Sequence, residues 1–333
     1  MAGSKRILVT NRAGIGDVIL STPIFKALKD KFPDSHLAVL VGSNVYDLLK
    51  GLSFIDEIIT YERGRDSVWS IIKKIWRYDV AICLDFTYRS ALFAFLAAIP
   101  LRAGLRHKRG LFLNRPVERD AQQEFIYEPY NYAGIIQRSL QMTLEGDLTK
   151  LFVSPATPQD LQSVDSLFKE AKLSSTAKII TIVPFSSADA KNWPLENVQS
   201  LIRQLRHNYN CEIVLLGSAA DRPKSEKLVD GVNWLGRTTL TEMAEIIRRS
   251  DLFIGHCSGP IHIAAATQTP IIALYGATSS AHWAPKNRTV VVEHPLSCTP
   301  CDATGFQCDH KQCMQSITLE EVLTACKTLL PEK

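Results

Sequence analysis

The sequence lacks an apolar run that would cross a bilayer. The longest apolar stretch of its first half, residues 91–101, is interrupted by Pro100, whereas a membrane-spanning helix needs about 20 apolar residues. No secretory signal is visible, because the first six residues are polar and basic and the apolar run after them stops at Thr10. Neither sign of charge dominates: the net charge of +4 gives no indication of nucleic-acid binding. We therefore expect a cytoplasmic protein.

Several catalytic signatures are also missing. The chain has no H-E-x-x-H, no Walker A motif, no nucleophile elbow and no Asp-x-Asp pair that could hold a metal-bound diphosphate. It also has no low-complexity tract. What remains is an ordinary globular composition, with 46% hydrophobic and 22% charged residues, and a length of 333 residues that allows two domains.

Short apolar runs alternate with amphipathic segments along the whole chain. This alternation predicts parallel sheets with helices on both faces. A Pro- and Ser-rich stretch at residues 154–158 interrupts it and indicates a domain boundary. Capping-box patterns at Thr239 and Thr318 predict two helix starts. The expected strands are 6–9, 37–41, 57–61, 80–84, 179–183, 212–216, 234–235, 252–255 and 271–275, and the expected helices are 23–31, 44–49, 67–77, 90–97, 159–171, 194–207, 239–249 and 319–330.

We expect two Rossmann-like domains of similar size, residues 1–155 and 156–333, facing each other across a cleft. In open α/β folds of this kind ligands bind beyond the carboxyl ends of the strands. The turns that follow predicted strands are therefore the first places to look for function.

The first such turn follows the strand at residues 6–9. Gly14 and Gly16 allow a tight turn and a close approach of a ligand. The dinucleotide fingerprint G-x-G-x-x-G is incomplete because position 19 is Ile, and the Asp17 carboxylate would repel a pyrophosphate. Asp17 is better suited to accept a proton, although an acidic residue here can also simply cap the following helix. Both interpretations stay open on the local sequence.

The first half contains a basic stretch at residues 101–119. Together with Arg63, Arg65 and Arg89, arginines such as Arg102 make this half locally basic. A solvated loop is one interpretation. The other is a site for an acidic or phosphorylated partner, since arginine forks suit carboxylates and phosphates.

Two turns of the second half combine features that suit phosphate oxygens. Residues 185–194 carry two hydroxyls and an ammonium, and residues 255–266 form a small-residue turn that opens a helix with Pro260. An ordinary strand-to-helix loop and a structural histidine fit the same residues. The candidates are Ser186, Ser187, Lys191, Ser258, Gly259 and His262.

Four cysteines gather near the end of the chain. Cys298 and Cys301 have the spacing of zinc ligands, whereas Cys308 and Cys313, with four residues between them, are less typical. A small structural metal site, disulfides and independent free thiols are all compatible with this pattern.

Taken together, three motifs make the sequence resemble glycosyltransferase family 9, the ADP-heptose–lipopolysaccharide heptosyltransferases and their relatives. The motifs are residues 16–23, Ser186-Ser187 with Lys191-x-Trp193-Pro194, and Ser258-Gly259-Pro260-x-His262. The resemblance implies a GT-B fold, with the acceptor on the N-terminal domain and the nucleotide sugar on the C-terminal domain. It also implies an inverting sugar transfer that requires no metal cofactor.

The resemblance also implies roles for individual residues. Asp17 would be the general base that takes a proton from the acceptor hydroxyl. Lys191 would hold the donor phosphates. The implied donor contacts are Ser186, Ser187, Lys191, Thr238, Ser258, Gly259, His262 and, as a looser match, Asp221; the expected acceptor contacts are Gly14, Gly16, Arg63, Arg65, Arg89 and Arg102.

One position departs from the family pattern. Members usually carry an acid just before Ser-Gly, whereas this chain has His256 and Cys257, and a thiol is a poor acceptor for sugar hydroxyls. We expect heptose transfer from ADP-heptose to a lipopolysaccharide inner core. The alternatives are another nucleotide sugar or surface-glycan acceptor, or a non-catalytic nucleotide-sugar binding protein.

The expected acceptor is lipid-linked and phosphorylated. Its chemistry would place the enzyme peripherally on the cytoplasmic face of a bacterial inner membrane. No nucleic-acid partner is expected, and a structural zinc at Cys298, Cys301, Cys308 and Cys313 stays an alternative.

Overall fold

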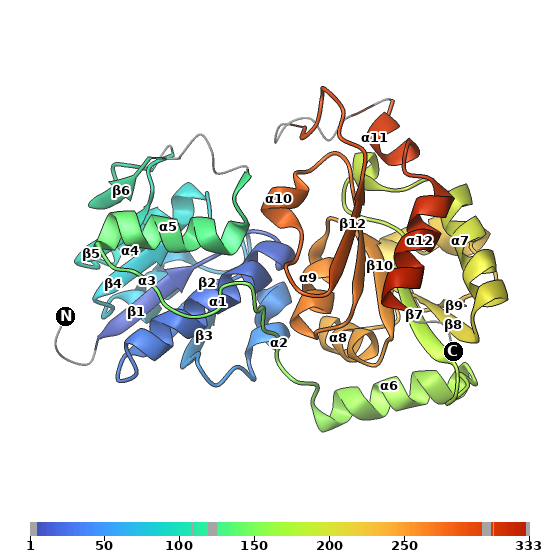
Figure 1. Cartoon of the computed structure of the whole chain (residues 1–333). Coiled ribbons are helices and arrows are strands. Elements are labelled where there is room, and N and C mark those ends of the chain that lie inside the picture. Colours follow the sequence, from blue (N-terminus) through green and yellow to red (C-terminus); the bar gives the residue numbers. More distant parts are fainter. Residues whose placement is uncertain (1–4, 108, 119–124, 302–307, 309, 331–333) are drawn as a thin grey trace. The chain divides into compact units, whose positions relative to one another are not determined.

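The chain folds into two compact units. The computed structural model describes residues 5–107, 109–118, 125–301, 308 and 310–330. Unit 1 comprises residues 1–154 and unit 2 comprises residues 155–333 (Figure 1).

Unit 1 is built on a six-stranded parallel sheet. The strand order is β3-β2-β1-β4-β5-β6, and each neighbouring pair is parallel. The direction of the strand order reverses between β1 and β4, which is where open α/β sheets bind their ligands. The strands are β1 (Arg6–Thr10), β2 (His36–Val41), β3 (Glu57–Thr60), β4 (Val80–Cys83), β5 (Leu101–Leu105) and β6 (Arg115–Val117).

Helices cover both faces of this sheet (Figure 1). Helices α3 and α4 pack on one face, where Phe93 and Ile75 meet strand residues such as Leu8 and Leu40. Helices α1 and α5 pack against each other on the opposite face. The helices of unit 1 are α1 (Ile15–Lys31), α2 (Tyr46–Leu49), α3 (Val68–Ile75), α4 (Tyr88–Leu96) and α5 (Glu128–Leu140).

Unit 2 repeats the same topology. Its strand order, β12-β11-β10-β7-β8-β9, reverses between β7 and β10, and all its neighbouring pairs are parallel. The strands are β7 (Lys178–Val183), β8 (Cys211–Leu215), β9 (Val232–Asn233), β10 (Leu252–His256), β11 (Ile271–Tyr275) and β12 (Thr289–Glu293).

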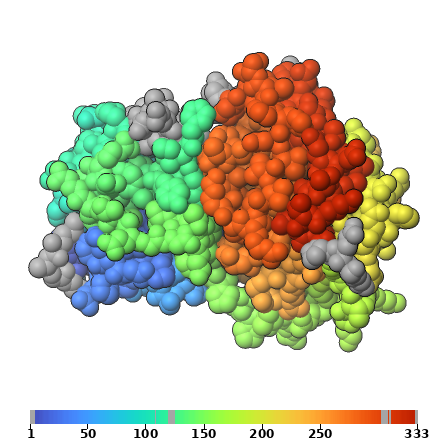
Figure 2. All heavy atoms as spheres, viewed as in Figure 1, coloured from blue at the N-terminus to red at the C-terminus, as the bar shows by residue number. Residues whose placement is uncertain are grey.

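The helices of unit 2 also form two layers. Helices α7 and α12 share an apolar core with one face of the sheet, and the red atoms of α12 reach the surface in Figure 2. Helices α8 and α9 pack together, and α6 packs on α8. The helices are α6 (Pro158–Glu170), α7 (Leu195–Asn208), α8 (Leu240–Arg248), α9 (Gly259–Ala266), α10 (Ser280–Trp283), α11 (Gln312–Gln315) and α12 (Leu319–Leu329). Within the described ranges, no helix is both long enough and apolar enough to cross a membrane.

The expected start of the first helix was wrong. Helix α1 begins at Ile15 and continues through Pro23, where we expected it to begin. Proline removes the N–H that would bond the carbonyl of Ile19. The Thr22 hydroxyl donates to that carbonyl over 2.6 Å instead, which lets the helix pass through the proline.

The stretch at 101–118 contains two strands, so its interpretation as a solvated loop was wrong. Strand β5 pairs with β4, and Gly104 lies opposite Cys83 in this register. A Cβ at Gly104 would lie 2.7 Å from the Cys83 carbonyl oxygen, so only glycine fits so close to β4. The sequence analysis also missed α5 and β12. The expected capping boxes at Thr239 and Thr318 are confirmed, since each hydroxyl accepts from the backbone amide three residues later.

Candidate functional site

Asp17 lies beyond the carboxyl end of β1, at the start of α1. Gly14 is the N-cap of the helix, and Oδ2 of Asp17 accepts a hydrogen bond from the Gly14 amide over 3.1 Å. The carboxylate is half-exposed. It therefore caps the helix and also stands at the edge of the sheet where a ligand can reach it. Capping and proton transfer are compatible at this position.

The buried side chains of Asn11 and Tyr132 support this turn. The buried Asn11 amide donates to the Asp17 carbonyl over 3.0 Å and to the Tyr132 hydroxyl over 3.3 Å. Burial raises the pKa of Tyr132 well above its ordinary value, with the charges of Glu128 and Asp17 adding to the effect. Tyr132 therefore stays neutral beside the carboxylate. The sequence analysis missed it because α5 was not expected.

A buried carboxylate, Asp85, follows β4 at the same edge. One oxygen accepts from the amide and hydroxyl of Thr87. The other accepts from the hydroxyls of Thr10 and Ser90, over 3.1 and 2.7 Å, and from the Arg12 amide over 3.3 Å. Asp85 thus fastens the turn after β1 to the turn after β4, at the point where the strand order reverses.

Arg109 neutralises Asp85. Both side chains are buried, and Nη1 of Arg109 lies 3.7 Å from Oδ1 of Asp85. The guanidinium also donates to the backbone carbonyls of Leu105, over 2.8 Å, and of Asp85. We expected Arg109 among the solvated or anion-binding arginines of its stretch. The structure corrects this expectation, because every part of the side chain is used inside unit 1.

The other predicted arginines occupy different ends of the sheet. Arg63, Arg65 and Arg89 follow β3 and β4, at the same edge as Asp17, and Arg65 pairs with Glu62 over 2.8 Å. Arg102 is the second residue of β5, so it lies at the amino-terminal edge. Its guanidinium donates to the carbonyls at positions 112 and 99. The structure therefore brings the first three arginines to the edge with Asp17, and Arg102 to the opposite edge.

In unit 2, the loop after β7 is held to the end of β10. The amide and hydroxyl of Ser186 both donate to Oδ1 of Asn192, over 2.7 and 2.8 Å. The Trp193 amide donates to Nε2 of His256 over 3.0 Å, and its indole N–H donates to the carbonyl of Ile317. The predicted donor residue Ser186 thus shapes this loop, which carries Lys191 near its end and Ser187 exposed at its middle.

Buried polar atoms of unit 2 without a hydrogen-bond partner in the described part of the chain include Oγ1 of Thr238, Nδ1 of His256 and Nδ1 of His262. Burial lowers the pKa of His262 to about 3, and burial together with the charge of Lys191 lowers that of His256 to about 4. Both imidazoles are therefore neutral near pH 7. Buried polar groups are normally paired, and gaps of this kind are typical of places where a ligand or water completes the structure.

The remaining predicted donor residues lie in turns of the same sheet. Ser258 is the N-cap of α9, which begins at Gly259, and its hydroxyl lies 3.3 Å from the carbonyl of His256. Asp221 follows β8, where its carboxylate accepts from Ser218 and pairs with Lys224 over 3.2 Å. The turns after β7 and β10 thus place Lys191, Ser258 and Gly259 at the switch point of the sheet.

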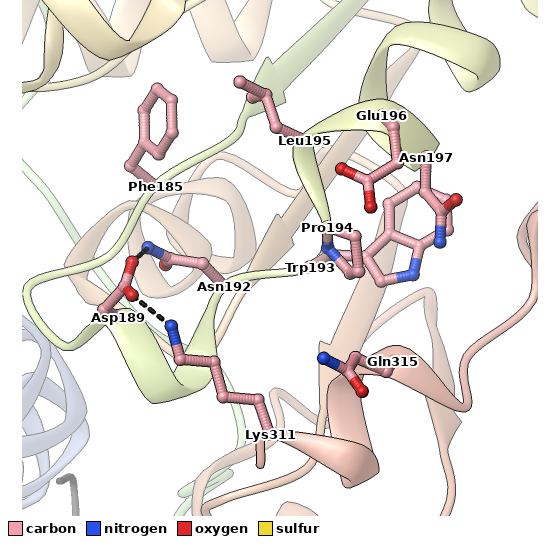
Figure 3. Close-up of a pocket in the computed structure, with 10 residues that line it drawn as sticks. All are labelled: Phe185, Asp189, Asn192, Trp193, Pro194, Leu195, Glu196, Asn197, Lys311 and Gln315. Atoms are coloured by element: carbon pink, nitrogen blue, oxygen red, sulfur yellow. Dashed lines mark hydrogen bonds and ion pairs between the residues drawn. The ribbon is translucent and has the colours of Figure 1, made fainter. Parts of the chain in front are cut away.

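A pocket of about 430 Å³ lies beside the loop after β7. Figure 3 shows the Asp189 carboxylate between the amide of Asn192 and the ammonium of Lys311. Lys311 lies between Cys308 and Cys313, so this ion pair links the loop after β7 to the cysteine stretch. The walls include Phe185, Pro194, Glu196 and Gln315.

The four predicted cysteines are neighbours, but they do not form a metal site in the described part of the chain. Burial raises the pKa of Cys313, and the nearby Cys301, Cys308 and Cys298 add to this effect. Among residues 5–107, 109–118, 125–301, 308 and 310–330, no group of three or more His, Cys, Asp or Glu side chains is arranged to hold a metal ion. Residues 302–307 and 309, inside the cysteine stretch, lie outside the described residues.

Comparisons with known proteins agree with this architecture. The family model described as glycosyltransferase family 9 (heptosyltransferase) matches residues 68–311. Lipopolysaccharide heptosyltransferase 2 of Salmonella typhimurium is 27% identical, over 82% of this chain and 83% of the relative. Lipopolysaccharide heptosyltransferase 3 of Escherichia coli is 24% identical, over 95% and 96%.

Solved structures share the fold over nearly the whole chain. The Escherichia coli ADP-heptose lipopolysaccharide heptosyltransferase II superposes with a TM-score of 0.80 at 25% identity, covering 98% of both chains. A family 9 glycosyl transferase from Veillonella parvula gives a TM-score of 0.82 at 22% identity, covering 99% of this chain and 98% of that one. The expected GT-B fold is therefore confirmed.

Proposed function

This chain belongs to glycosyltransferase family 9, and we propose that it transfers heptose from ADP-heptose to a sugar of a lipopolysaccharide inner core. The relatives named above are heptosyltransferases of lipopolysaccharide. One observation carries the chemistry: a half-exposed carboxylate, Asp17, stands in a rigid turn at the switch point of unit 1. Such a group is suited to act as a general base.

The acceptor belongs to unit 1 in this proposal. Asp17 takes the proton of the acceptor hydroxyl while the hydroxyl oxygen attacks the anomeric carbon of heptose. The new carbon–oxygen bond forms as the bond to the diphosphate breaks, so ADP leaves and the anomeric configuration inverts. The proposed acceptor contacts are Gly14, Gly16, Arg63, Arg65 and Arg89; Arg102, expected among them, is left out because it lies at the opposite edge of the sheet and donates to backbone carbonyls there.

The donor belongs to unit 2. Lys191 and the amino terminus of α9 supply positive charge and N–H groups, which stabilise the charge that grows on the diphosphate. The buried polar atoms of Thr238 and His262 that have no partner in the described structure support a ligand at these turns. The other proposed donor contacts are Ser186, Ser187, Asp221, Ser258 and Gly259.

The proposal needs no metal cofactor, because Lys191 and the helix terminus neutralise the leaving group. The proposed acceptor is lipid-linked and phosphorylated, which would place the enzyme at the cytoplasmic face of the inner membrane. His256 and Cys257, at the edge of the donor site, favour a second candidate: the same reaction with a different nucleotide sugar or glycan acceptor.

The test is ADP release from ADP-heptose with a heptose-deficient lipopolysaccharide core as acceptor. Release that depends on the acceptor and disappears in Asp17→Ala supports the proposal. Binding of ADP without release, by the parent protein, would reject this donor and acceptor pair. A panel of nucleotide sugars, with ADP, UDP and GDP compared by thermal shift, then decides for or against the second candidate.

A further inference from the structure

Arg12 has buried N–H groups that no acceptor among the described residues satisfies. It follows β1, in the same turn as Asp17, and its guanidinium lies over the ring of Tyr61, 4.4 Å from the centroid, with Phe93 at 5.8 Å. Its Nε and Nη1 atoms are buried and have no hydrogen-bond acceptor among the described residues. Aromatic rings attract a cation but offer no oxygen to its N–H groups.

The Asp85 carboxylate attracts the Arg12 charge but gives no acceptor to its buried Nε and Nη1 atoms. Asp85 already accepts hydrogen bonds on both oxygens and is paired with the buried Arg109. Burial lowers the pKa of Arg12, an effect that the Asp85 charge opposes and the neighbouring Arg89 reinforces. Asp85 is thus shared between two arginines, and Arg89 adds a like charge beside Arg12. A buried cation whose donors are unmatched is costly unless something else supplies the acceptors.

A small oxyanion would supply what is missing. Carboxylates and phosphate monoesters provide both negative charge and hydrogen-bond acceptors, and a guanidinium suits either of them. The surroundings restrict the position of such a group, because Tyr61 fixes one side of the guanidinium and the Arg12 amide is held by Asp85. The turn is thus preorganised for an anion at the carboxyl edge of the sheet.

We propose that Arg12 binds an anionic substituent of the acceptor, a carboxylate or a phosphate monoester on or beside the sugar that is glycosylated. This inference rests on the proposed function, which places the acceptor on unit 1. Because Arg12 and Asp17 belong to one turn, an anion on Arg12 would position the acceptor hydroxyl near the base. The enzyme would then discriminate between charged and neutral acceptors through this arginine.

Anion binding can be tested without any sugar transfer. In ¹⁵N-labelled full-length protein, the buried Nε–H of Arg12 should exchange slowly with water and give a resonance that Arg12→Lys removes. Inorganic phosphate or acetate should shift this resonance saturably, and chloride at equal ionic strength should not. The anion that shifts the resonance, phosphate or acetate, shows whether the bound substituent is a phosphate or a carboxylate. A resonance that responds to both anions no more than to chloride overturns the proposal.

Acceptor kinetics provide the second test, with Arg77 as the matched control. Arg77 also stacks on an aromatic ring, Trp76, at 4.6 Å, but it is exposed and precedes β4, at the other edge of the sheet. Arg12→Met should raise the KM for the acceptor by about 10- to 100-fold, as expected for a lost charge-assisted hydrogen bond, and leave the KM for the donor within twofold. Arg77→Met should change neither.

A third test uses acceptors from which the phosphate or carboxylate charge has been removed. On acceptor treated with phosphatase, or with its carboxyl groups reduced, parent and Arg12→Met should become equal for whichever group Arg12 binds. An undiminished difference on both neutral acceptors overturns the proposal. If the parent protein transfers nothing in any arm, the proposed function fails, whereas the resonance titration still decides whether Arg12 binds an anion.

Discussion

The backbone amide of Trp193 donates a hydrogen bond to Nε2 of His256 over 3.0 Å. This bond fixes the tautomer, because Nε2 must be the acceptor and the proton must lie on Nδ1. It also ties the loop after β7 to the end of β10, the two strands between which the strand order reverses. A proton on Nε2 would remove the acceptor and loosen the loop that carries Lys191.

Stability should therefore fall in mildly acidic solution. The pKa values of His256 and His262 are lowered to about 4 and about 3, from an ordinary value near 6.5. Between about pH 4.5 and pH 6 the unfolded chain binds protons that the folded chain does not, so stability rises with pH there. The two residues together should contribute up to about 2.7 kcal/mol per pH unit. Urea unfolding at several pH values measures this slope.

The histidine variants provide the control for the pH prediction. His262→Asn should remove about half of the slope between pH 4.5 and pH 6, even if it lowers stability at every pH. A slope unchanged in both His262→Asn and His256→Gln would show that other groups cause the acid sensitivity. Glu321 contributes mainly below this window: its pKa is lowered to about 2, chiefly by hydrogen bonds from Thr318, so the stability that it adds is lost as the pH falls from the ordinary pKa of glutamate toward 2.

Asp17→Asn should lower kcat/KM for transfer by about 10²- to 10⁴-fold, because an amide cannot accept the acceptor proton. Asp160→Asn is the matched control. Asp160 also occupies the third position of a helix and accepts from a cap residue, Thr157, over 2.8 Å. Each change should cost about 1 kcal/mol of stability through the cap, but only the first should reduce ADP release. Equal activity losses in the two variants would reduce the role of Asp17 to capping.

Lys191→Gln should reduce kcat by about 10²- to 10³-fold, in line with the loss of one charge that stabilises a leaving group. The same change should raise the pKa of His256, because the Lys191 charge helps to lower it. The exposed Lys169, in the last turn of α6, provides the control variant Lys169→Gln, which should alter neither quantity. Initial rates of ADP release and the histidine titration followed by NMR measure the two effects. Retention of full activity in Lys191→Gln would exclude the lysine from the reaction.

Gly104→Ala should destabilise unit 1. The new methyl group would lie 2.7 Å from the Cys83 carbonyl oxygen, and the residue has a φ of +154°. Separating β5 from β4 to make room should cost about 1–3 kcal/mol. Gly134→Ala in α5 is the control, since nothing lies within 4 Å of its Cβ position, and it should be neutral or stabilising. Thermal unfolding compares them, and equal melting temperatures for both variants would contradict the packing argument.

Some elements could be predicted from the sequence because their local pattern matches their environment. Strands such as β2 and β11 are buried on both faces, so they read as continuous apolar runs. Strand β5 could not be found this way, because Arg102 and Gly104 interrupt its apolar pattern. Its arginine is satisfied by backbone carbonyls and its glycine by the neighbouring strand, and both partners become visible only after folding.

Likewise, only some residues of the candidate site could be predicted from the sequence. Asp17 and Lys191 lie in turns whose local composition drew attention to them. Arg12, Tyr61 and Asp85 come from turns after three different strands, so only the strand order of the folded sheet brings them together. Nothing in the residues around Asp85 indicates that it is buried and neutralised by an arginine from the turn after β5.

The chain crosses from unit 1 to unit 2 only once, between residues 154 and 155. Ser154, the last residue of unit 1, is buried, donates its amide to the Leu48 carbonyl and accepts the Gly51 amide on its hydroxyl. Unit 2 begins at the next residue. One recombination breakpoint near this position would therefore exchange a complete parallel sheet with all its covering helices. Genes of this architecture can acquire a whole unit from a relative in a single event, without splitting either core.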